Sequence, residues 1–172
     1  MDVLVIVTGG TLDKVHDSLN ETLAFPETQN SHFTDLLDEA RCSHPRVLTL
    51  YLKDSLDVTD ADRQVILSAL RQADEAHIVI THGTSTMGET ARFLARNLDA
   101  KTAGKTIVLT GAMRPFSLGG SDASFNVGGA IIGAQSLAPG IYGVMNGRII
   151  KAEDLRKNTE LGRFDVPDAP QS

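Results

Sequence analysis

Short apolar runs that break directly into glycine and hydroxyl residues constrain the fold of this chain most strongly. Residues 3–11 (VLVIVTGGT) and residues 77–84 (HIVITHGT) follow this pattern, and so do residues 106–111 (TIVLTG). Continuous apolar runs of this length are typical of the buried strands of a parallel sheet. Because ligands of open α/β sheets bind beyond the carboxyl ends of the strands, we expect one crevice lined with hydroxyl groups.

The order of these runs predicts an α/β fold. Segments with helical periodicity separate the apolar runs, and alternation of strands with helices implies a doubly wound, mostly parallel sheet with helices on both faces. We expect a single domain over residues 1–172, with a frayed tail at 167–172. The predicted strands are residues 3–8, 47–51, 78–81, 107–110 and 141–144, and the predicted helices are residues 33–40, 60–73, 87–98 and 122–137.

Three local patterns refine this outline. Residues 13–31 are polar without a clear period, which predicts a long loop. Thr59 is a candidate helix cap, and Thr86 with Glu89 has the spacing of a capping box. Small residues in the segment 128–134 (GGAIIGA) indicate close packing of the last helix against another element, in the same chain or in a second subunit.

Charge and cysteine content exclude several classes of protein. The net charge of −6 argues against a nucleic-acid partner or an anionic membrane surface. Cys42 is the only cysteine, which precludes an intrachain disulfide and is compatible with a reducing compartment. The residues after Met1 have neither the basic segment nor the cleavage site of a signal peptide, so we expect a cytoplasmic protein. The five histidines are scattered without the spacing of metal ligands, so we expect no metal.

From the residues alone, two interpretations of Thr11 stay open. Its hydroxyl is a potential nucleophile if a neighbouring base takes its proton, and Gly10 lets backbone amides approach a ligand closely. Alternatively, the hydroxyls of Thr8 and Thr11 only satisfy the amides of a turn. The turn matches neither nucleotide-binding glycine motif, which weakens a nucleotide interpretation.

Several motifs together resemble the bacterial-type L-asparaginase/glutaminase family. They occur in family order and span most of the chain: residues 8–12 (TGGTL), residues 81–91 (THGTSTMGETA), residues 109–115 (LTGAMRP) with Asp122 and Asn126, residues 143–146 (GVMN) and residues 154–158 (DLRKN). The resemblance implies an enzyme that releases ammonia from the side-chain amide of asparagine, and often of glutamine, with no metal or cofactor. This chain resembles the short form, equivalent to the N-terminal domain alone.

The resemblance also implies the catalytic residues. Thr11 falls on the nucleophilic threonine of the family, Thr84 falls on the second essential threonine, and Lys157 falls on the lysine that hydrogen-bonds to that second threonine. A threonine hydroxyl needs proton removal during attack, which a base network containing the lysine can supply. The expected mechanism is a two-step acyl transfer through a threonine ester. Whether Thr11 or Thr84 attacks first stays open, although the family favours Thr11.

Substrate-binding positions follow from the same resemblance. Ser55 matches a serine that holds the substrate carboxylate, and Gly10 and Gly83 match backbone positions beside the substrate. Ser85 stands where the family has an aspartate that pairs with the substrate ammonium group. Thr22 lies near the expected place of a tyrosine on a mobile loop.

The departures from the family pattern keep alternatives open. Losing a charged partner costs roughly 1.5–3 kcal/mol of binding, unless Asp54 or Asp57 replaces the missing carboxylate. His82 could carry a proton, although it matches a family position of structural use. The alternatives are an amidase for glutamine or another small amide, and a non-catalytic small-molecule binding module. Because the chain stops before the smaller C-terminal domain, we expect a homo-oligomer, a dimer or a tetramer, to close the pocket.

Overall fold

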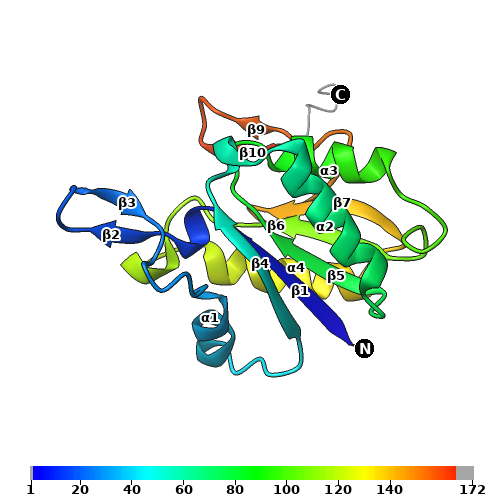
Figure 1. The fold of residues 1–172 in the computed structure, drawn as a ribbon, viewed down its shortest axis with the longest axis horizontal. Coiled ribbons are helices and arrows are strands. Elements are labelled where there is room, and N and C mark those ends of the chain that lie inside the picture. The colour runs from blue at the N-terminus through cyan, green and yellow to red at the C-terminus, as the bar shows by residue number, and fades with distance from the viewer. Residues whose placement is uncertain (1, 166–172) are drawn as a thin grey trace, which may run out of the picture.

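A six-stranded sheet forms the centre of the computed structural model, which describes residues 2–165. The strand order is β4-β1-β5-β6-β7-β8, and every neighbouring pair is parallel except β7 and β8 (Figure 1). The strands are β1 (Val3–Gly9), β4 (Arg46–Lys53), β5 (His77–Thr81), β6 (Thr106–Thr110), β7 (Gly140–Met145) and β8 (Arg148–Lys151). The five predicted strands and their parallel arrangement are therefore confirmed, and β8 is added at one edge.

Helices cover both faces of the sheet, as the sequence predicts for a doubly wound fold. One face packs against α2 (Asp60–Gln72) and α3 (Met87–Arg96), and the other packs against α1 (Phe33–Glu39) and α4 (Ala123–Ser136). In β1, Leu4 and Ile6 belong to the first core, whereas Val3, Val5 and Val7 belong to the second. Both faces of the strand are buried, which explains why its sequence is apolar without alternation.

The two predicted helix caps have different outcomes. Thr59 caps α2 in a capping box in which Asp62 is the reciprocal partner, so this prediction is confirmed. The capping box predicted for Thr86 and Glu89 is wrong, because the Thr86 side chain makes no capping hydrogen bond. Its hydroxyl instead donates to the carbonyl oxygen of Ser55 at 2.7 Å. This hydrogen bond replaces the cap and links the start of α3 to the loop after β4.

The predicted long loop at residues 13–31 contains regular structure, so the prediction is wrong for its first half. Strands β2 (Val15–Asp17) and β3 (Thr22–Ala24) form an antiparallel hairpin that stands out from the body of the molecule (Figure 1, left). The Asp17 carboxylate closes its turn by accepting hydrogen bonds from the backbone of Leu19 and from Asn20. The hydrogen bonds of Asp17 lower the pKa of this exposed carboxyl.

A second small hairpin follows the sheet. Strands β9 (Lys157–Asn158) and β10 (Arg163–Phe164) pair antiparallel and lie at the top of Figure 1 beside α3. Leu155 and Phe164 anchor this segment, because both side chains are buried in the core shared with α2 and α3. The sequence patterns predict no strand here. The predicted frayed tail at 167–172 lies outside the described residues.

Candidate active site

Three strand ends meet through glycines that leave no space for a side chain. Gly10, which follows β1, has a φ of +89°, and a Cβ there would lie 2.5 Å from the backbone nitrogen of Gly83. A Cβ on Gly83, which follows β5, would lie 2.7 Å from the hydroxyl oxygen of Ser55, which follows β4. The loops after β1, β5 and β4 are therefore in direct contact, at the carboxyl edge where the sequence predicts a crevice.

Thr84 and Lys157 come together at the same edge. The Nζ atom of Lys157 donates to the Thr84 hydroxyl oxygen at 3.1 Å. Thr84 is buried directly after β5, whereas Lys157 is half-buried on β9 and lies 73 positions later in the chain. The β9–β10 hairpin, which the sequence patterns do not predict, therefore positions Lys157, which the family resemblance does predict.

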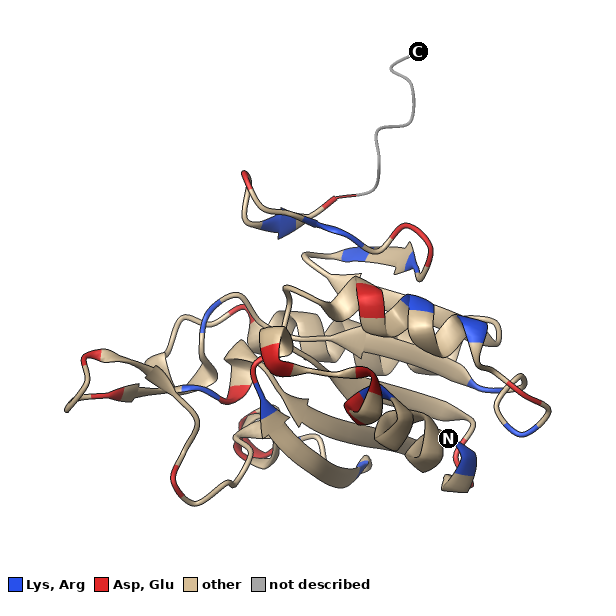
Figure 2. Ribbon diagram, turned by 45° about the horizontal axis from the view of Figure 1, so that its top comes forward, with Lys and Arg blue, Asp and Glu red and all other residues tan. Residues whose placement is uncertain are grey.

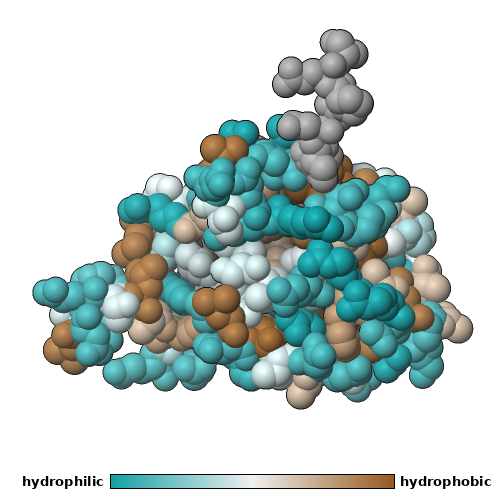
Figure 3. Space-filling view, turned by 90° about the horizontal axis from the view of Figure 1, so that it is seen from above, coloured by the Kyte–Doolittle hydropathy of each residue, from teal (hydrophilic) through white to brown (hydrophobic). Residues whose placement is uncertain are grey.

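A cavity of about 250 Å³ opens beside this pair, and its lining residues include Thr84, Ser85, Arg92, Arg156 and Lys157. In Figure 2 the ribbon of the β9–β10 hairpin and of the helix beneath it is blue at its Lys and Arg positions. Seen from that side, the surface has a pale hollow of intermediate hydropathy between hydrophilic flanks (Figure 3). Arg92 and Arg156 give the cavity wall two positive charges against the one negative charge of Glu89, so this cationic wall favours an anionic group on a ligand.

Thr11 and Ser55 occupy the neighbouring loops. Thr11 begins the 3-10 helix η1 (Thr11–Asp13), is half-buried, and has a hydroxyl that bonds to no other group among residues 2–165. Ser55 begins η2 (Ser55–Asp57) and is buried, and its hydroxyl oxygen accepts a hydrogen bond from the backbone N–H of Ser85 at 3.2 Å. The predicted residues Gly10, Ser55, Gly83, Thr84, Ser85 and Lys157 therefore form one connected set, and Thr11 adjoins it through Gly10.

The other predicted contributors are Thr22, Asp54 and Asp57. Thr22 is exposed on β3, where it pairs with Asp17, so its contribution stays a prediction. The Asp54 carboxylate pairs with the Lys14 ammonium group, and this hydrogen bond lowers the pKa of Asp54. It also accepts from the backbone N–H of Leu56 at 3.0 Å. Its charge is thus already engaged, whereas Asp57 is exposed at the end of η2.

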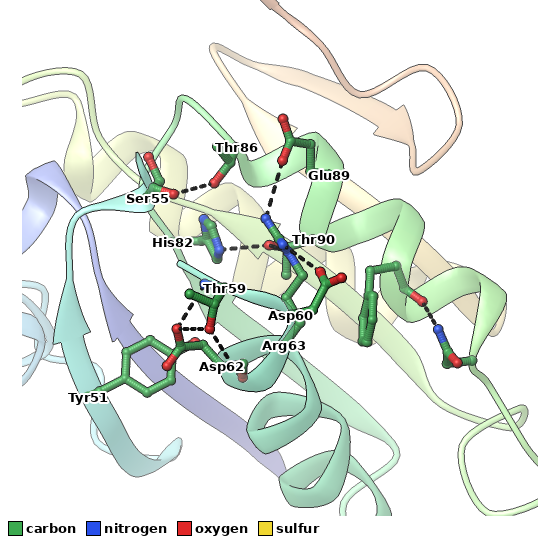
Figure 4. A network of polar contacts seen from close by, with 12 residues as sticks. Tyr51, Ser55, Thr59, Asp60, Asp62, Arg63, His82, Thr86, Glu89 and Thr90 are labelled. Atoms are coloured by element: carbon green, nitrogen blue, oxygen red, sulfur yellow. Dashed lines mark hydrogen bonds and ion pairs between the residues drawn. The ribbon is translucent and has the colours of Figure 1, made fainter. Parts of the chain in front are cut away.

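A series of buried polar groups adjoins Gly83 through His82 (Figure 4). His82 is the only member of this series that the sequence suggests as a functional residue. His82, Thr90 and Arg63 hydrogen-bond in series and come from β5's end, α3 and α2. Burial lowers the pKa of His82 to about 4. Arg63 lies between Asp62 and Gln64 in a polar stretch of α2, so the sequence gives no signal for this arrangement.

Residues 2–165 hold neither a cluster of metal ligands nor a membrane-spanning helix. No group of three or more His, Cys, Asp or Glu side chains there is arranged to hold a metal ion. No helix in the same range combines the length and apolar character needed to cross a membrane.

Comparison with known proteins relates both the sequence and the fold to asparaginases. The chain is 42% identical to L-asparaginase 2 of Escherichia coli over 91 residues, which cover 50% of this chain and 25% of that protein. It is 27% identical to L-asparaginase 2 of Bacillus subtilis over 172 residues, 91% of this chain and 44% of that protein. The chain thus spans less than half the length of these relatives.

The fold has close counterparts among solved structures. The thermostable L-asparaginase from Thermococcus kodakarensis superposes with a TM-score of 0.81 and 28% identity, over 99% of this chain and 52% of that one. The family model described as "Asparaginase, N-terminal" matches residues 2–171. This match extends over nearly every residue, and the motifs at the strand ends lie within it, so the chain belongs to the asparaginase N-terminal domain family.

Proposed function

We propose that this chain hydrolyses the side-chain amide of L-asparagine to aspartate and ammonia through a threonine ester. The observation that carries the proposal is the hydrogen bond from Lys157 to Thr84 beside the contact between Gly10 and Gly83. Further support comes from the family and from relatives named L-asparaginase and glutaminase-asparaginase.

The proposed chemistry has two steps. In the first, the Thr11 hydroxyl oxygen bonds to the amide carbon, its proton passes through a base to the nitrogen, and the C–N bond breaks to release ammonia. In the second, water adds to the ester carbon, one of its protons passes through the base to the threonine oxygen, and the bond between that oxygen and the carbon breaks to release aspartate. Lys157 and Thr84 act as a proton-accepting pair, and backbone N–H groups near Gly10 and Thr84 stabilise the developing oxyanion.

Recognition of the substrate is proposed to rest on Ser55, Gly10, Gly83 and Ser85. The Ser55 hydroxyl donates to the substrate carboxylate, and the cationic wall of the cavity assists by its charge. Ser85 offers a neutral hydroxyl in place of a carboxylate, which favours a second candidate: an amidase for glutamine or another small amide whose binding depends less on an ammonium group. Thr22 is proposed to contribute only if the β2–β3 hairpin folds toward the cavity. No cofactor is part of the proposal.

Ammonia release from L-asparagine tests this function. We expect release by the wild-type chain, at least a hundredfold loss in Thr11→Ala, and a comparable loss in Lys157→Met, which keeps the length of the side chain but removes its amine. Loss in Lys157→Met without loss in Thr11→Ala would assign the nucleophile to Thr84. Ser31→Ala is a matched control, because it removes a hydroxyl that donates to Asp13 in the segment after Thr11.

The competing interpretations give different results. If millimolar asparagine yields no ammonia, the same assay with glutamine and other small amides distinguishes the amidase from the binding module. A ligand that raises the melting temperature without turnover supports the binding module, because binding to the folded state alone stabilises it.

We also propose that copies of this chain associate. The proposal is supported by a largely apolar groove of about 610 Å³ beside α4 and β8. Phe125, Ile132 and Ile149 are exposed along it, next to Gly128, and exposed apolar patches of this kind mark interfaces. Sedimentation of the wild type and of Ile132→Asp tests this, and a wild type that sediments as a monomer would contradict it. A cytoplasmic location is likewise proposed, and one structural relative is described as a probable cytoplasmic L-asparaginase.

A further inference from the structure

The hydrogen bonds from Arg63 through Thr90 and His82 to the Gly83 carbonyl are all donated in the same direction. The Nδ1 atom of His82 lies 2.8 Å from the carbonyl oxygen of Gly83. A carbonyl oxygen can only accept, so Nδ1 carries the proton. The other ring nitrogen, Nε2, lies 2.9 Å from the Thr90 hydroxyl oxygen. In neutral histidine Nε2 is then an acceptor, and the Thr90 hydroxyl donates to it.

Arg63 fixes the far end of this series. Its Nε–H donates to the Thr90 hydroxyl oxygen at 3.1 Å, which leaves the Thr90 proton free to point at His82. The guanidinium group also donates to Asp60 at 2.8 Å and to Glu89 at 3.3 Å. Arginine stays protonated, so this donor cannot reverse its role. Figure 4 shows the resulting series from Asp60 and Glu89 through Arg63 and Thr90 to His82.

Burial keeps the series in this one state. His82 and Thr90 are fully or almost fully buried, at 1% and 0% exposure. Desolvation lowers the pKa of His82 to about 4, and the nearby Arg63 charge acts in the same direction. The imidazole is therefore neutral at neutral pH, and its two nitrogens are both occupied. It does not act as the base that the sequence analysis considers.

The Gly83 carbonyl connects this series to the candidate active site. In a trans peptide the C=O and the following N–H point in opposite directions. The hydrogen bond from His82 to the Gly83 oxygen therefore also sets the direction of the Thr84 N–H. The peptide is further confined because Gly10 and Ser55 contact Gly83 so closely that no Cβ fits.

We propose that Arg63, Thr90 and His82 are positioning residues that hold the Gly83–Thr84 peptide, and with it the Thr84 hydroxyl that meets Lys157, in the orientation needed for amide hydrolysis. The inference rests on the proposed function. The positioning residues touch no substrate, and they act through one peptide plane. Their loss is expected to lower kcat with little change in KM, since the orientation of the reacting groups changes more than the binding contacts.

A hydroxyl deletion at Thr90 tests the proposal with matched variants. Thr90→Val keeps the shape of the side chain and removes the link between Arg63 and His82, whereas Thr90→Ser keeps the hydroxyl. We expect about a tenfold fall in kcat with Thr90→Val, with KM unchanged within threefold, and near wild-type kcat with Thr90→Ser. Thr106→Val is the control, because it removes a comparable hydrogen bond, to Leu137, at the opposite end of the strands.

Nitrogen NMR of the histidine ring supplies a readout that needs no turnover. We expect the Nδ1–H tautomer of His82 in the wild type, without titration between pH 5 and 8. We also expect the Thr84 amide signal to shift in Thr90→Val, but not in Thr90→Ser or Thr106→Val. A wild-type Nε2–H tautomer, an unmoved Thr84 signal, or equal kcat in Thr90→Val and the wild type would overturn the proposal. If the wild type releases no ammonia, the proposed function is wrong. The positioning of the Gly83–Thr84 peptide is then tested by the His82 tautomer and the Thr84 amide signal alone.

Discussion

The substrate preference of the proposed enzyme depends strongly on the side chain of Ser85. Its backbone N–H holds the hydroxyl oxygen of Ser55, while its own side chain is exposed at the cavity. The candidate replacement Asp54 already pairs with Lys14. Arg92 and Arg156 leave the cavity wall cationic, and its one carboxylate, that of Glu89, already pairs with Arg63, so a substrate ammonium group finds little compensation there.

A carboxylate at position 85 should therefore improve the binding of L-asparagine. We expect Ser85→Asp to lower KM for asparagine by about tenfold or more, because a hydrogen bond to a charged group contributes roughly 1.5–3 kcal/mol. Steady-state kinetics with Ser85→Asn as the uncharged control measures this. An equal KM in both variants would mean that no ammonium group lies opposite residue 85.

At the scale of elements, burial on both faces made the central strands predictable. Val3, Val5 and Val7 face one core and Leu4 and Ile6 the other, so the apolar run alone identifies β1. The two small hairpins lack that signal. The β2–β3 strands have exposed or half-buried residues throughout, and their pairing depends on the turn that Asp17 closes. The β9–β10 hairpin has two-residue strands, and Phe164 fixes it only through tertiary packing.

The ends of β5 and β6 offer a comparison of two buried hydroxyls. Thr81 and Thr110 are direct neighbours in the sheet. The Thr81 hydroxyl is buried with no hydrogen-bond partner among the described residues, whereas the Thr110 hydroxyl donates to the carbonyl oxygen of Val144 at 2.9 Å. An unsatisfied buried hydroxyl costs free energy, and a satisfied one contributes to stability.

Thr81→Val should therefore leave the free energy of unfolding unchanged or raise it, and Thr110→Val should lower it by about 1 kcal/mol. The two substitutions remove the same atom from adjacent strands, so each serves as the control of the other. Urea unfolding measures both. A larger loss with Thr81→Val than with Thr110→Val would contradict the assignment of the hydrogen bonds.

At the scale of the whole molecule, the site depends on contacts that no local pattern encodes. Motif order placed Thr84 and Lys157 in the same site, but their hydrogen bond spans 73 positions and needs the β9–β10 hairpin to be docked. The series from Arg63 through Thr90 to His82 joins two helices and a strand end, and Arg63 belongs to none of the recognised motifs. The grouping of the motif residues at the strand ends was therefore predictable, whereas the hydrogen bonds behind them were not.

The free energy of unfolding should depend on pH because His82 is buried. The pKa of His82 is about 4 in the folded state, against an ordinary value near 6.5. Between these values the unfolded state binds more protons, so the free energy of unfolding rises with pH. The contribution is complete above about pH 6.5 and is lost as the pH falls to 4, a change of about 3 kcal/mol.

Comparison with His82→Asn isolates this contribution, since burial raises the pKa of Asp13 and gives an opposite slope. Urea unfolding of both proteins between pH 4.5 and 7.5 should show a steeper rise for the wild type. Parallel curves would show that His82 titrates alike in the folded and unfolded states.

The place of β1 between β4 and β5 has a consequence for synthesis of the chain. The strand Val3–Gly9 leaves the ribosome before both of its neighbours, and the second of them ends only at Thr81. At usual elongation rates this is a delay of roughly 4 to 15 seconds. Until then this strand with its apolar run Val3–Val7 is paired on one edge at most, and such segments aggregate readily. The nascent chain is therefore expected to depend on chaperones until β5 has emerged.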